Sequence, residues 1–173
     1  KEISLLKKEI HDFKIAAKNQ ATFGKNSQAL IDSVKKNKQE QRQGEGRGQY
    51  ILRSIALHYE VCCGVIYMKN EETQQFDLAG QFALTDDPKY TSINEQDGIA
   101  GLAISSGKVQ NWTDIPDDYI SISSGLGQTK SLQLYVLPLK KNGNVEAVIE
   151  VACFGKLVLA DIWSDIDNLL LNE

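Results

Sequence analysis

The segment that decides the fold, residues 97–108, reads DGIAGLAISSGK. Glycines stand near both of its ends and small or apolar residues lie between them, which predicts a loop, a short helix and a glycine stop. This helix belongs to a long stretch, residues 94–127, that separates two groups of predicted strands. Because connections of this length usually line a functional site, we expect the stretch to do so here.

Apolar runs on either side of this stretch predict two β-hairpins. They pair residues 61–68 with 76–84, and residues 132–139 with 145–154, each across a polar turn. In the last run both alternating faces are partly apolar, so both faces of the sheet should be covered, one by helices and the other by the long stretch. The order helix, hairpin, long segment, hairpin, helix predicts an α+β fold with an antiparallel sheet.

Helical patterns precede and follow the hairpins. Residues 50–59 are amphipathic, and residues 159–171 close the chain with an apolar stripe. Near the N-terminus, apolar residues recur at heptad spacing, although the seam is polar or small in its middle. Three glycines within residues 44–48 indicate a break. We therefore predict a helical linker over residues 1–43 and one domain over 44–173. The linker is either a coiled coil or a helix folded on its own domain.

Residues 98–108 and the last hairpin resemble the GAF family. The pattern Gly-Ile-x-Gly-x-Ala-x-x-x-Gly-Lys matches the central helix of that family, and the run VEAVIEVA at 145–152 matches its last strand. Residues 114–127 resemble a branch that is common in multi-domain bacterial sensor proteins, including hybrid histidine kinases. The resemblance covers roughly residues 48–173. It departs from the family at Ala147, where GAF domains often have Gly.

This resemblance implies a six-stranded antiparallel sheet with helices on one face and a ligand pocket, or its remnant, on the other. It also implies dimerisation through terminal helices. The implied function is that of a non-catalytic sensory domain in a bacterial signal-transduction protein, such as a two-component system, which binds a small molecule and transmits through its terminal helices. The alternatives are a structural dimerisation module without a ligand, and a redox enzyme similar to methionine sulfoxide reductases.

The candidate ligand-binding residues combine aromatic and hydroxyl side chains with one carboxylate of the last strand. They are Tyr90, Trp112, Tyr119, Ser121, Ser123, Ser124 and Glu150. Such a mixture suits an apolar pocket with a few polar contacts. In the alternative interpretation these side chains fill the pocket themselves and Glu150 bonds to a loop. The sequence names neither a ligand nor a cofactor.

Catalysis, metal binding and covalent chromophore attachment are not expected. His11 and His58 lie on predicted helices away from the glycine-rich segment, so no Ser-His-Asp set can be assembled. Cys62 and Cys63 point to opposite faces of a strand, and no second Cys/His pair supplies zinc spacing. Bilin-binding GAF domains anchor the chromophore on a Cys of the middle segment, where this chain has none before Cys153. The Asn-Lys-x-x-Phe-Asp-Glu set of cyclic-nucleotide-binding GAF domains is also absent.

Composition and the N-terminal pattern indicate the partners. The chain has 173 residues and a net charge of -4, so nucleic acid is not an expected partner. We expect a cytoplasmic location without direct membrane contact by this segment, because no apolar stretch reaches the length of a membrane span. The first residue is Lys1, which suggests a segment of a longer protein, and that protein could carry a membrane anchor elsewhere. A helix that carries the apolar stripe of Ile3, Leu6, Ile10 and Phe13 would extend beyond the domain, so this stripe needs a partner other than its own core. The pattern predicts a parallel homodimer through the N-terminal and C-terminal helices.

Overall fold

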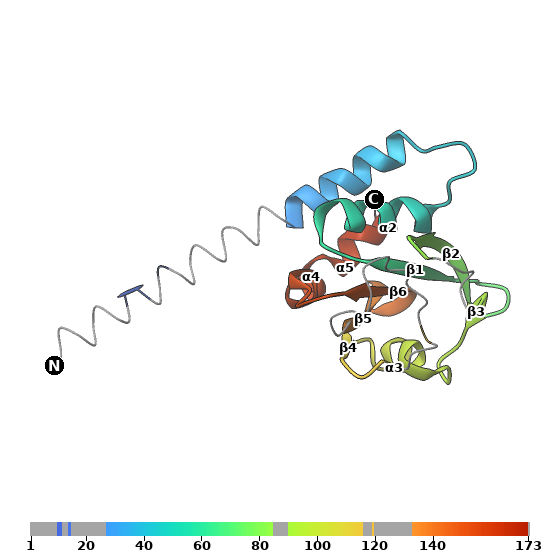
Figure 1. Cartoon of the computed structure of the whole chain (residues 1–173). Helices are drawn as coiled ribbons and strands as arrows, with labels where there is room; N and C mark the ends of the chain where they lie inside the picture. The colour runs from blue at the N-terminus through green and yellow to red at the C-terminus, as the bar shows by residue number, and fades with distance from the viewer. Residues whose placement is uncertain are drawn as a thin grey trace.

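The computed structural model describes residues 10, 11, 14, 27–84, 90–115, 119 and 133–172 (Figure 1). Within these residues, six strands form one antiparallel sheet in the order β3-β2-β1-β6-β5-β4. The strands are β1 Cys63–Lys69, β2 Phe76–Phe82, β3 Ser92–Ile93, β4 Gln110–Trp112, β5 Gln133–Lys141 and β6 Asn144–Cys153. The predicted α+β fold with an antiparallel sheet is confirmed.

Both predicted hairpins are present, and the two central strands of the sheet come one from each. β1 pairs with β2 and β5 pairs with β6, while the β1–β6 pairing joins the two hairpins. The β5–β6 turn follows from its sequence, because Asn142 and Gly143 both have positive φ, at 53° and 83°. Asn-Gly is strongly preferred in two-residue hairpin turns that require positive φ at both positions.

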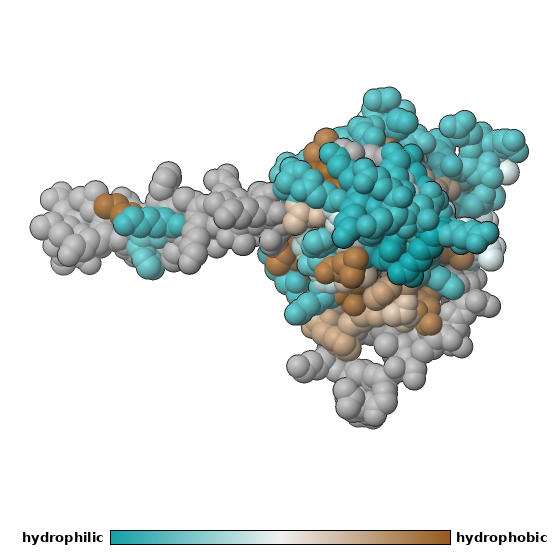
Figure 2. Space-filling model, turned by 90° about the horizontal axis from the view of Figure 1, so that it is seen from above, coloured by the Kyte–Doolittle hydropathy of each residue, from teal (hydrophilic) through white to brown (hydrophobic). Residues whose placement is uncertain are grey.

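Helices cover one face of the sheet (Figure 1). They are a helix over residues 27–39, α2 Arg47–His58, α4 Val158–Asp161 and α5 Trp163–Asn172. Their apolar sides pack on Ile149 and Val151 of β6 and on Leu137 of β5, whose side chains point to this face. Seen from the helical side, the outer surface is largely hydrophilic, as expected for amphipathic helices (Figure 2). None of the described helices is long and apolar enough to cross a membrane.

Two sequence-based boundaries need correction. Gly48 was assigned to the break before α2, but α2 begins at Arg47 and includes Gly48. A Cβ on Gly48 would lie 2.7 Å from the Cβ of Ala79, so this glycine allows close packing of α2 on β2. The single closing helix is in fact two helices, α4 and α5, which meet at Ile162, where φ is −110° and ψ is 5°.

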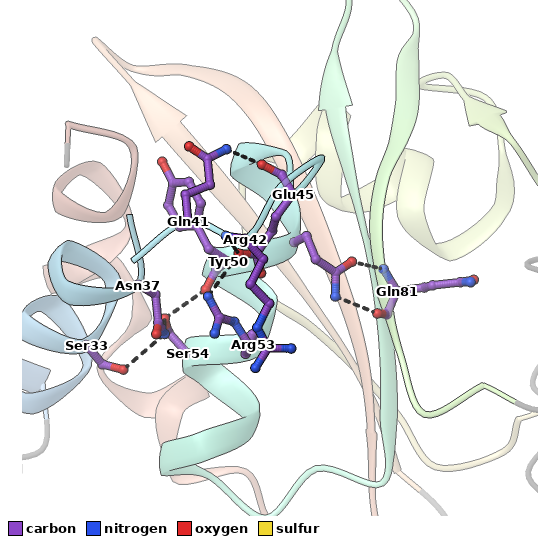
Figure 3. Close-up of polar contacts among 10 residues, drawn as sticks. Ser33, Asn37, Gln41, Arg42, Glu45, Tyr50, Arg53, Ser54 and Gln81 are labelled. Carbon is purple, nitrogen blue, oxygen red and sulfur yellow. Dashed lines mark hydrogen bonds and ion pairs between the residues drawn. The ribbon is translucent and has the colours of Figure 1, made fainter. Parts of the chain in front are cut away.

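The helix over residues 27–39 lies in the region that the sequence assigned to the linker. Leu30, Ile31 and Val34 are buried in the core that α2 and α5 share. Polar contacts also hold it, because Asn37 Nδ2 donates to Ser54 Oγ at 2.7 Å (Figure 3). Residues 27–39 therefore fold on their own domain, as one of the two alternatives proposed.

Most of the predicted coiled-coil stripe lies outside the described residues. Ile3, Leu6 and Phe13 are not described, whereas Ile10 is helical and 53% exposed. The division of the chain at residues 43 and 44 stays a prediction.

The opposite face of the sheet carries α3 Gly98–Ser106, the short helix predicted from the deciding segment. It ends at Gly107 in the left-handed conformation, with φ at 61°, which is the predicted glycine stop. Ala100, Ala103 and Ile104 of α3 are buried against this face of the sheet. A Cβ on Gly101 would lie 2.6 Å from the carbonyl oxygen of Glu95, so only glycine lets the helix start this close to the preceding loop.

Candidate functional site

Glu150 lies at the centre of the α3 side of the sheet. Its strand, β6, is one of the two central strands, and its neighbours in register are Val65 on β1 and Val136 on β5. Val65 and Val136 both belong to the apolar cluster beneath α3. Glu150 itself is 6% exposed. A carboxyl group in such surroundings is costly unless it is neutral or hydrogen-bonded, so its position calls for a partner.

That partner is Tyr119, which belongs to the long stretch between the hairpins. The Tyr119 hydroxyl donates to Glu150 Oε2 at 3.1 Å. Burial raises the pKa of the Glu150 carboxyl from 4.5 to about 7, while the Tyr119 hydrogen bond opposes this effect by favouring the ionised form. The pKa of Tyr119 is raised as well, first by burial and then by the charge of Glu150. Glu150 can therefore gain or lose a proton near neutral pH.

Tyr67 is a site residue that the sequence-based reasoning missed. It stands on β1 opposite Val148, which lies two residues from Glu150 on β6 and so shares its face. Its hydroxyl donates to the backbone oxygen of Tyr90 at 3.3 Å, and its pKa is raised by burial, by Glu150 and by Tyr90. Strand alternation places Tyr67 on the same face as Val65, but only the pairing of β1 with β6 brings it beside Glu150.

The other predicted site residues divide into three groups. Tyr90 is 43% exposed, and its backbone oxygen holds Tyr67. Trp112 ends β4 opposite Leu134 of β5, so it lies on the Glu150 side of the sheet but on an edge strand, where it is 38% exposed. Ser121, Ser123 and Ser124 lie outside the described residues. The structure thus brings Tyr119 and Glu150 into contact, places Tyr90 beside Tyr67, and sets Trp112 towards the rim. A ligand-binding role for these residues stays a prediction.

The three cysteines of the chain gather where β1 begins and β6 ends. Cys63 and Cys153 are buried, and burial raises the pKa of each thiol to about 12. The pKa of Cys62 is also raised, mainly by burial. Since the thiolate is the reactive form, these thiols are poor nucleophiles at neutral pH. Among the described residues, no group of His, Cys, Asp or Glu is arranged to hold a metal ion.

The α3 side of the sheet therefore offers Glu150 as a buried ionisable acceptor among apolar and aromatic residues. Hydroxyl groups of Tyr67 and Tyr119 lie on the same face. Such an arrangement can hold a small molecule by a few directed hydrogen bonds and by contact with ring faces.

Comparison with known proteins gives similarity at the level of the fold. No protein-family model and no curated protein sequence matches the chain. Among solved structures, the GAF domain of nlh2 from A. aeolicus in an inactive state is 16% identical, with a TM-score of 0.58 over 86% of this chain and 98% of that one. The GAF domain of a phosphoenolpyruvate-protein phosphotransferase from Coxiella burnetii is 11% identical, with a TM-score of 0.56 over 85% of this chain and 91% of that one.

An enzyme is among the similar structures too. The free methionine-R-sulfoxide reductase from Neisseria meningitidis in complex with its substrate is 16% identical, with a TM-score of 0.52 over 73% of this chain and 74% of that one. Identities this low carry the fold and not the activity. The predicted branch, that of hybrid histidine kinases, stays a prediction. Together with the strand order and the position of α3, these similarities show that the chain has the fold of GAF domains.

Proposed function

We propose that this chain is a non-catalytic sensory or regulatory domain of a bacterial signal-transduction protein, which binds a small molecule on the α3 side of its sheet. The observation that carries the proposal is Glu150, a buried carboxyl group at the centre of that face, bonded at 3.1 Å to a tyrosine of the long middle stretch. A polar group in an apolar wall lowers stability, so its presence there favours recognition over packing. A cytoplasmic parent protein of the hybrid histidine kinase type fits this function, and the three free thiols fit a reducing compartment.

Binding is tested by NMR titration of the ¹⁵N-labelled chain with a library of small molecules that spans cationic, neutral and anionic compounds. We expect at least one class to shift the amide signals of β6 near Glu150 and of residues around Tyr119, because both line the proposed site. A library that shifts no signal on this face would contradict ligand binding. The alternative function, a dimerisation module whose site is filled by its own Tyr119, would then be favoured.

The proposal that the chain is not an enzyme rests on its thiols. Cys63 shares a sheet face with Val65, yet its pKa of about 12 leaves almost no thiolate at neutral pH. We expect no reduction of free methionine sulfoxide with dithiothreitol as reductant. Turnover that disappears in Cys63→Ser would overturn this part of the proposal and establish a reductase.

We further propose that the chain forms a homodimer through its terminal helices, which would carry a signal from the site to neighbouring domains. Leu169 on α5 is 44% exposed and Ile10 is 53% exposed, so apolar side chains remain uncovered on both terminal helices. Sedimentation at micromolar concentration tests this directly, and we expect the mass of two chains. A monomer under these conditions would remove the dimer and the transmission mechanism that depends on it.

A further inference from the structure

The charge balance around Glu150 indicates what a ligand must bring. When ionised, a carboxylate only accepts hydrogen bonds, and a buried charge is stable only if an opposite charge or several donors compensate it. The ion pairs of Lys36, Arg53, Lys140 and Lys156 are made with other carboxylates, and within the described part of the chain the hydrogen bond recorded for the Glu150 carboxyl comes from a neutral hydroxyl. A positive group with N–H donors would compensate the charge of the ionised Glu150. An anion would be repelled.

The walls of the site favour the same kind of ligand. Tyr67 and Tyr119 lie beside Glu150, and Tyr90 is held next to Tyr67 by its backbone oxygen. The faces of phenol rings attract cations, and this attraction grows when water is excluded. A buried carboxylate with tyrosines beside it is thus better suited to an organic cation than to an anion.

Tyr119 occupies the position that such a ligand would take. Its neutral hydroxyl supplies the one donor described for Glu150 Oε2, at 3.1 Å. An ammonium or amidinium group would form a shorter and stronger charge-assisted hydrogen bond with the same oxygen. The ligand and the Tyr119 hydroxyl are therefore competitors for one acceptor.

We infer that the site binds a small organic cation, whose ammonium or amidinium group replaces the Tyr119 hydroxyl on Glu150. This inference rests on the proposed function, since it names the chemical class of the ligand for the same site. It gives Tyr119 two roles, that of an internal occupant when the site is empty and that of an aromatic wall when it is filled.

The test uses three probes of similar size and different charge: benzylamine, benzyl alcohol and benzoate. Affinities are measured by NMR titration at about pH 8, where benzylamine is protonated and most of Glu150 is ionised. We expect benzylamine to bind about tenfold or more tightly than benzyl alcohol, and benzoate not to bind. Glu150→Gln should weaken benzylamine about tenfold or more, because the charge is lost while the shape is kept.

Tyr119→Phe distinguishes competition from simple loss of a contact. It removes the competing hydroxyl and keeps the ring, so benzylamine should bind up to about tenfold more tightly. Tyr135→Phe is the matched control, because Tyr135 packs on the helical side of the sheet and its hydroxyl donates to Gln133 Oε1, away from Glu150. This variant should leave the affinity within about twofold. Circular dichroism of each variant checks that it is folded. If Glu150→Gln does not fold, the probe series and Tyr119→Phe decide the question.

The outcomes separate the inference from the function on which it rests. If benzyl alcohol or benzoate binds at this face as tightly as benzylamine, the site binds ligands but the cation assignment is wrong. Unchanged benzylamine affinity in Glu150→Gln, or weaker binding in Tyr119→Phe, would also overturn the assignment. If neither the three probes nor the wider library binds, the proposed function fails together with the inference.

Discussion

Replacing Glu150 by Gln should change how the stability of the protein depends on pH. Gln keeps the volume and the acceptor for the Tyr119 hydroxyl, but it cannot ionise. In the folded protein the pKa of Glu150 is raised to about 7 from 4.5. A raised carboxyl pKa means that folding favours the protonated form. The contribution of Glu150 to stability is therefore fully present below pH 4.5 and is lost as the pH rises through about 7.

The size of this loss follows from the two pKa values. Each tenfold change in an acid dissociation constant corresponds to about 1.4 kcal/mol, so the interval from 4.5 to about 7 corresponds to about 3 kcal/mol. Water entry and relaxation around the buried charge reduce this figure, so it is an upper bound. Even half of it is a large fraction of the stability of a small domain.

Urea denaturation of the wild type and Glu150→Gln, at about pH 4.5 and about pH 8, measures the effect. Between the lower and the higher pH, the unfolding free energy of the variant should rise by about 2 to 3 kcal/mol relative to that of the wild type. Gln serves as the control for all other titrating groups, which both proteins share. In Tyr119→Phe the loss of stability should extend to higher pH. The hydroxyl that favours the ionised form of Glu150 is then absent, so the pKa of Glu150 should be higher still. A difference between wild type and Glu150→Gln that is the same at both pH values would refute the reasoning.

Three further predictions concern the scaffold, and each is checked by chemical denaturation. Gly101→Ala places a Cβ 2.6 Å from a backbone oxygen and should cost about 1 to 3 kcal/mol, whereas Gly155→Ala, with nothing within 4 Å, should be nearly neutral. Val34→Ala should cost about 1 to 3 kcal/mol, because Val34 is fully buried; a neutral result would mean that the helix over residues 27–39 does not pack on the domain. Lys140→Met removes the cation that lies 3.6 Å from the carboxylate of Asp167, whose side chain is 1% exposed. This change should lower the free energy of unfolding by about 1 to 3 kcal/mol, and an unchanged stability would show that the ion pair contributes nothing.

The sheet and the short helix could be predicted because local sequence determines them. Alternation in the last strand, the Asn142-Gly143 turn and the glycines that bound α3 each act within a few residues of themselves. The packing of residues 27–39 could not be decided in this way. Ile31 and Val34 fit a coiled-coil seam and a core-facing stripe equally well, and the choice depends on the distant surface of α2 and α5.

The candidate site was predictable in part for the same reason. Glu150 stood out because it shares a strand face with the apolar Val148, and Tyr119 because it belongs to a long connection. Tyr67 did not stand out, since a tyrosine in a strand is ordinary. Its place beside Glu150 depends on the register between β1 and β6, two strands that lie about 80 residues apart in the chain and whose pairing local patterns do not specify.

The central position of β6 has a consequence for how a signal would cross the domain. Glu150 faces α3, while its neighbours in the chain, Ile149 and Val151, face the helical layer. The two layers thus share the same peptide groups, and any displacement of the backbone at Glu150 moves two side chains that pack under the helices. A β-sheet is a single backbone layer whose successive side chains point to opposite faces. A ligand that shifted the backbone at Glu150 would therefore displace side chains under the helices directly, without a chain of intermediate side-chain contacts.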